Sequence, residues 1–162
     1  MNSSVTSVLT RAISKLLLLP TLVAAAAILV KGYSQPGDGF SAGVVAGLGV
    51  LLQYLAFGRE EAEKLPVVRS AGVLAFVGLL LALLVAVVPL FLGDPLLTHY
   101  PPPEGEVLIF GTLEILTAVL FDVGVFLLVF GFSVVTTSIL ARTIADEEEY
   151  ALEEPVGEGE EA

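Results

Sequence analysis

Long apolar runs separated by short polar segments dominate the chain. Each run is long enough for a membrane-spanning helix, since about 20 helical residues cross roughly 30 Å of hydrocarbon at 1.5 Å per residue. The pattern predicts an all-α integral membrane protein with about four transmembrane helices. The expected spans are residues 12–30, 40–58 and 70–93, and a last one that ends near residue 140.

The polar segments supply turns and one longer interruption. Residues 31–39 read KGYSQPGDG and predict a turn, whereas residues 59–69 read REEAEKLPVVR and form a charged connection. A proline triplet in 94–106 favours an extended loop. Residues 107–141 are too long for one crossing, because a helix of that length would reach about 52 Å. We expect a short broken or re-entrant segment up to about residue 118, before the last span.

The distribution of basic residues predicts the orientation. Six of the seven lie on one side of a four-span arrangement, and only Lys31 lies on the other. The positive-inside rule therefore predicts cytoplasmic N- and C-termini in a multi-pass protein of the cell membrane. The expected parts are a cytoplasmic N-terminus (1–11), a transmembrane domain (12–142) and an acidic, disordered cytoplasmic tail (143–162).

Composition narrows the chemistry that the chain can perform. Of 162 residues, 56% are hydrophobic, which excludes a conventional soluble enzyme. The net charge of −11 comes mostly from nine acidic residues in 146–162, and seven basic residues offer no surface for nucleic acid. The absence of cysteine excludes disulfides, cysteine-based zinc sites and iron–sulfur clusters within this chain. We therefore predict a chain that is not an enzyme and holds no metal or cofactor.

Small residues mark candidate helix-packing faces. Gly39, Gly43 and Gly47 follow one another at intervals of four and so share one face of the second span. In lipid, close backbone approach over small residues supplies packing energy in place of the hydrophobic effect. We add Gly124 and Gly131 of the last span as packing candidates. The sequence leaves open whether these faces contact this chain or another subunit.

Two carboxylates in the last apolar region are the main candidates for ion transport. A charge in hydrocarbon costs several kcal/mol, so neither Asp122 nor Glu114 is expected to face lipid. On one continuous helix they would lie about 12 Å apart along the axis and about 80° apart around it, too far for a shared proton. Such a carboxylate either lines an ion or proton path or serves only assembly. Asp38 and Lys31, which flank the first turn, are weaker candidates for an ion entrance.

Two motifs resemble those of the MnhB/MrpB family. The first is QPGDGFSAG at 35–43, where the family pattern is approximately N-x-PGGGF-x-GG, so that Asp38 and Ala42 replace glycines. The second is FDVG at 121–124, which matches the family's F-D-[IVL]-G. The resemblance extends from about residue 14 to residue 141 and leaves the acidic tail outside.

The resemblance implies a subunit of a multisubunit Mrp-type Na⁺/H⁺ antiporter, with other membrane subunits as partners and Na⁺ and H⁺ as the transported ions. It also implies an alternative, because related domains occur in membrane-bound hydrogenases and similar complexes related to respiratory complex I. A third possibility is a purely structural subunit that holds its neighbours in register. Asp122 is the residue on which the transport hypothesis depends most.

Overall fold

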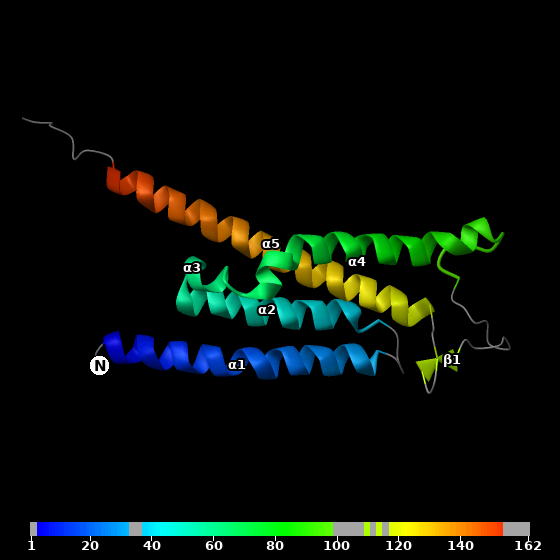
Figure 1. The fold of residues 1–162 in the computed structure, drawn as a ribbon, viewed down its shortest axis with the longest axis horizontal. Helices are drawn as coiled ribbons and strands as arrows, with labels where there is room; N and C mark the ends of the chain where they lie inside the picture. Colours follow the sequence, from blue (N-terminus) through cyan, green and yellow to red (C-terminus); the bar gives the residue numbers. More distant parts are fainter. Residues whose placement is uncertain (1–2, 33–36, 99–108, 111–112, 115–116, 154–162) are drawn as a thin grey trace, which may run out of the picture.

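The computed structural model describes residues 3–32, 37–98, 109–110, 113–114 and 117–153 (Figure 1). Within these ranges the chain is helical except for turns and one very short hairpin. Four helices in the described ranges are long and apolar enough to cross a membrane, which confirms the predicted all-α membrane fold. The elements are α1 (Ser3–Lys31), α2 (Gly39–Phe57), α3 (Arg59–Ala62), α4 (Pro66–Phe91), β1 (Ile109–Phe110), β2 (Leu113–Glu114) and α5 (Thr117–Glu153).

Helix boundaries follow the glycine and proline residues of the sequence. Helix α2 ends before Gly58, which has φ of 80°, a backbone conformation that glycine adopts without steric cost. Helix α4 begins with Pro66, whose missing N–H is no loss in a first helical turn. The predicted break before the last span is a hairpin, in which β1 and β2 pair antiparallel and Phe110 lies opposite Leu113.

The four long helices form a single row rather than a closed bundle. Helix α1 packs against α2, α2 against α5, and α5 against α4, so the order in space is α1, α2, α5, α4 (Figure 1). Helix α1 runs antiparallel to α2, and α5 runs antiparallel to α4, whereas α2 and α5 run parallel to each other. The N-terminus lies at the same end as α3 and the later part of α5. This arrangement places the ends of the chain on one side, as four spans require. Which side of the membrane that is stays a prediction.

Helix α5 is longer than the sequence analysis predicts. It spans 37 residues, about 55 Å, and its last part extends past α2, α3 and α4 in Figure 1. The tail predicted as disordered from residue 143 is therefore helical as far as Glu153. The physical reason is that Ala, Leu and Glu favour a helix and that Pro155 is the first helix breaker after Gly131. Residues 154–162 lie outside the described ranges.

Small residues hold α5 between α2 and α4. A Cβ added at Gly43 would lie 2.9 Å from the Cβ of Val129, and one added at Gly47 would lie 2.9 Å from the Cβ of Ser133. On the other side of α5, a Cβ at Gly131 would lie 2.5 Å from the carbonyl oxygen of Ala71. The glycine face of α2, which the sequence left without a definite partner, packs within this chain.

A polar contact links α1 to α2 inside the row. The side-chain amide of Gln53 donates a hydrogen bond of 2.8 Å to the backbone carbonyl of Ser14. Both residues are buried, with 5% and 2% of their surface exposed. Because a buried amide must be hydrogen-bonded, this contact fixes the register of the two helices.

Glu63 links the connection between α2 and α4 to the later part of α5. Its Oε1 accepts hydrogen bonds from the Nε of Arg59 at 3.2 Å and from the Nε of Arg142 at 3.1 Å. The hydroxyl of Ser138 donates to the same oxygen at 3.4 Å. Burial alone raises the pKa of Glu63, but the hydrogen bonds and charges of Arg142 and Arg59 bring the pKa below its usual value of 4.5.

We expect Gly131→Ala to destabilise the packing of α5 on α4, because the new methyl group meets backbone that cannot move aside. Overpacking of this kind costs about 1–3 kcal/mol. The check is thermal unfolding of the purified protein in mild detergent. Gly72→Ala is the matched control, since its Cβ would lie 3.9 Å from the nearest atom and alanine is the better helix former. Equal unfolding temperatures for the two variants would contradict the prediction.

Glu63→Gln is expected to lower the thermal unfolding temperature at pH 7. Because the pKa of Glu63 is lower in the folded state, its carboxylate stabilises the fold above the unfolded-state pKa of about 4.3. That stabilisation is lost as the pH falls through the folded-state pKa, so wild type and variant should converge below about pH 4.

The control for this measurement is Glu60→Gln, which makes the same charge change at a residue that forms no ion pair with other described residues. If the difference in unfolding temperature between wild type and Glu63→Gln stayed constant from pH 7 to acid pH, the stabilising role of the Glu63 carboxylate would be contradicted.

Candidate functional site

Asp122 lies at one end of the helix row, the end where the turn connects α1 to α2. It is the sixth residue of α5, about 7.5 Å along the axis from the helix start, and only 5% of its surface is exposed. Its Oδ2 accepts a hydrogen bond of 2.6 Å from the backbone N–H of Gly37. The carboxylate that the sequence singled out is therefore held against the first turn, 85 residues away in sequence.

Glycines in this turn make room for Asp122. A Cβ on Gly32 would lie 3.2 Å from the Oδ2 of Asp122 and 3.0 Å from the carbonyl oxygen of Leu29. A Cβ on Gly39 would overlap the backbone carbonyl of Asp122. Gly37 itself has φ of 121°, which disfavours any residue with a side chain. The turn can approach the carboxylate closely only because these three positions are glycine.

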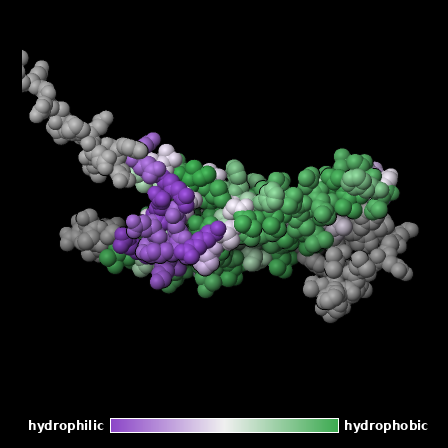
Figure 2. All heavy atoms as spheres, turned by 45° about the horizontal axis from the view of Figure 1, so that its top comes forward, coloured by the Kyte–Doolittle hydropathy of each residue, from purple (hydrophilic) through white to green (hydrophobic). Residues whose placement is uncertain are grey.

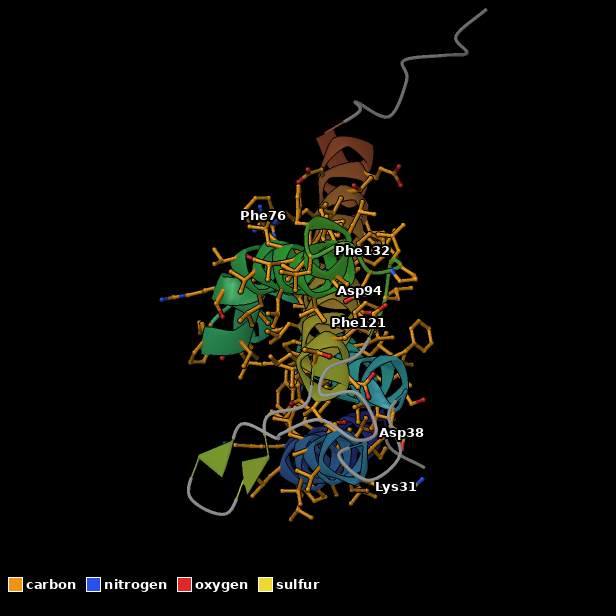
Figure 3. The ribbon with its side chains drawn as sticks, turned by 90° about the vertical axis from the view of Figure 1, so that its right-hand side faces the viewer. Lys31, Asp38, Phe76, Asp94, Phe121 and Phe132 are labelled. Atoms are coloured by element: carbon orange, nitrogen blue, oxygen red, sulfur yellow. The ribbon has the colours of Figure 1, made fainter. Side chains whose placement is uncertain are left out.

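Lys31 and Asp38 form a separate ion pair beside this contact. The Nζ of Lys31 lies 3.3 Å from the Oδ2 of Asp38, and the side chains are 66% and 28% exposed (Figure 3). An exposed pair of this kind contributes about 0–1 kcal/mol. Among the described residues, Lys31 therefore compensates Asp38 and not Asp122.

Glu114 does not share a helix with Asp122. It belongs to β2, where its backbone lies opposite Ile109 of β1, and α5 begins only at Thr117. The separation calculated for one continuous helix therefore does not apply, and Glu114 lies in the interruption that the sequence predicts before the last span. The side chain of Glu114 lies outside what the structure describes.

The structure brings only part of the predicted set together. Asp122 contacts the turn that carries Asp38. Of the five predicted packing glycines, the three on α2 closely contact α5 and the two on α5 closely contact α4. No group of three or more histidine, cysteine or acidic residues suited to a metal ion occurs in the described ranges. Sequence reasoning missed the cluster around Glu63, although the mixed charges of 59–69 and the isolated Arg142 were visible signals.

Comparisons with known proteins place the chain in a family. The family model for domains related to the MnhB subunit of Na⁺/H⁺ antiporters matches residues 9–135. Proteins named antiporter subunit mnhB2 from Staphylococcus aureus strains Newman, JH1 and NCTC 8325 are each 30% identical over 135 residues, which cover 83% of this chain and 92% of the relative.

The family match covers the first three spans almost completely and the fourth as far as residue 135, so it stops before the acidic end of α5. These matches confirm the predicted resemblance and the prediction of a subunit of a multisubunit Na⁺/H⁺ antiporter. Such a subunit implies other membrane subunits as its partners. The chain therefore belongs to the MnhB family of multi-pass antiporter subunits.

Proposed function

We propose that this chain is a non-enzymatic part of the ion-translocating module of a Na⁺/H⁺ antiporter in the cell membrane, and that Asp122 is its ion-responsive group. The observation that carries the proposal is the position of Asp122, a carboxylate that is 95% buried near one end of the spans. Its hydrogen-bond donor is a neutral backbone N–H. The ions to which Asp122 would respond are Na⁺ and H⁺.

Charge compensation supports this role. A carboxylate taken out of water is costly unless a counter-charge or a proton neutralises it. The N–H of Gly37 contributes a partial positive charge, whereas Lys31 is engaged with Asp38. A proton or a sodium ion at Asp122 would complete the compensation. Because the site lies near the end of the row, it suits an ion entrance better than a site at the bilayer midplane.

A structural role for Asp122 is the second candidate, and the same contact favours it. The hydrogen bond to Gly37 and the close approach of Gly39 tie the start of α5 to the turn between α1 and α2. In that case the carboxylate needs only to accept a hydrogen bond. The two candidates differ in whether Asp122 must be ionisable.

Asp122→Asn separates the two roles, because the amide oxygen can still accept the Gly37 hydrogen bond but the side chain no longer ionises. We expect the variant complex to assemble and to lose most of its Na⁺-dependent proton exchange. Assembly is measured by native electrophoresis of the complex purified through another subunit. Exchange is measured in everted membrane vesicles with a fluorescent pH indicator.

Two further variants make the result interpretable. Asp146→Asn makes the same chemical change at an exposed position of α5 and is expected to leave assembly and exchange unchanged. Asp122→Ala removes the hydrogen-bond acceptor and is expected to weaken assembly. Full exchange by the assembled Asp122→Asn complex, together with poor assembly of Asp122→Ala, would reject ion transport by Asp122 and establish the structural role.

A further inference from the structure

A polar recess lies between α4 and α5 at the end of the row that carries α3. Its volume is about 440 Å³, within the range of small-ligand pockets. Figure 2 shows hydrophilic residues gathered over α3 and the neighbouring part of α5, beside a hydrophobic surface on the spans. The recess therefore lies where the spans leave the hydrocarbon. Its lining residues are Glu60, Glu63, Lys64, Val68, Arg69, Ser138 and Arg142.

The charged residues around the recess have a net excess of one positive charge, and among the described residues both Arg69 and Glu60 are outside its ion pairs. Glu63 is shared by Arg59 and Arg142, and Lys64 forms an ion pair with Glu61. Arg69 forms no ion pair with any other residue that the structure describes. Residues 59–69 together with Arg142 contain four cations and three carboxylates. A ligand with a single negative charge would make the region neutral.

The helix surface below Arg69 is apolar and exposed. Val73, Phe76 and Leu80 follow Arg69 at intervals of four, three and four residues, so they lie on the same face of α4. Their exposed fractions are 65%, 62% and 49%. A molecule that binds Arg69 through an anionic group and covers this stripe needs a polar head and an apolar chain.

We propose that the recess binds the headgroup of an anionic phospholipid with one phosphodiester charge, such as phosphatidylglycerol. Arg69 binds the phosphate, Lys64 and Arg142 add to the positive potential, and an acyl chain lies along Val73 and Phe76. Basic pockets between membrane helices at the interface bind lipid headgroups by this combination of charge and apolar contact. The site lies at the opposite end of α5 from Asp122 and does not depend on its role.

The test uses the assembled complex in vesicles of phosphatidylethanolamine and phosphatidylglycerol that contain a photoactivatable phosphatidylglycerol. After illumination, lipid adducts on this chain are quantified by mass spectrometry and mapped to peptides. We expect adducts on the peptides around residues 64–76 in the wild type. Arg69→Gln should reduce them about fivefold, since one basic residue near the surface contributes about 1 kcal/mol to binding an anionic lipid.

Four comparisons decide between the possible outcomes: two further variants, a second photoactivatable lipid and competition by inorganic phosphate. Arg69→Lys should retain most of the labelling, and Arg11→Gln, which removes a cation from α1 outside the recess, should retain all of it. Equal labelling of wild type and Arg69→Gln, or equal labelling by a photoactivatable phosphatidylethanolamine, would overturn the proposal. Loss of labelling on addition of inorganic phosphate would overturn it as well, because the occupant would then be the free anion. The comparison of the two lipids needs only wild-type protein, so it holds even if Arg69→Gln fails to assemble.

Discussion

The close backbone contact of α5 with both of its neighbours is the constraint on which the rest of the structure depends. On α5, the positions that contact α2 are Asp122, Phe126, Val129 and Ser133, and those that contact α4 are Gly124, Leu128 and Gly131. Each set follows helical spacing, and the two sets are offset by two residues, or about 200°. They therefore lie on opposite sides of α5.

Helix α2 repeats this design, with Gly43 and Gly47 toward α5 and Gly49 toward Thr21 of α1. Helices α2 and α5, which are adjacent in space, each carry small residues on two opposite sides. Each can therefore accept a close neighbour on either side, and this produces a row.

The sequence was sufficient to predict the helices and insufficient to predict their order in space. Apolar length and turn residues predict the second and third spans close to their observed bounds, because the bilayer fixes the length that a helix needs. Helices α1 and α5 extend beyond the prediction, to Ser3 and Glu153, because polar residues can continue a helix outside the hydrocarbon. The glycine spacing of α2 predicted a packing face but not its occupant, since any helix with small or short side chains fits such a face. The contact of Asp122 with Gly37 lies 85 residues apart in sequence and has no local signal. The apolar pattern predicts an interruption before the last span, which contains Glu114, but it carries no signal for the antiparallel pairing of β1 and β2.

Helix α5 connects two polar sites of different character. Asp122 near its start and Arg142 near its later part are 20 residues apart, about 30 Å along the axis. The first is a buried carboxylate that accepts a hydrogen bond from a neutral donor, and the second belongs to an exposed ionic cluster centred on Glu63. Between them, glycine contacts on both sides leave little room for α5 to slide. The close packing of α5 therefore holds the two sites at a fixed separation, with the backbone of one helix between them.

A single row of helices also determines what must surround the protein. A closed bundle hides one side of every helix, but a row leaves two broad apolar faces, and large residues such as Phe76 on α4, Leu48 on α2 and Phe132 on α5 are more than half exposed. Lipid can cover such faces, since helix association in a bilayer is not driven by the hydrophobic effect. Glycines are concentrated at the contacts inside the row, whereas many large side chains cover its faces. Helix α1 differs, because Ala24, Ala26 and Ala27 are exposed there. Helix α1 therefore offers a neighbouring subunit close backbone contact, whereas the large exposed side chains of α4 and α5 offer side-chain interdigitation.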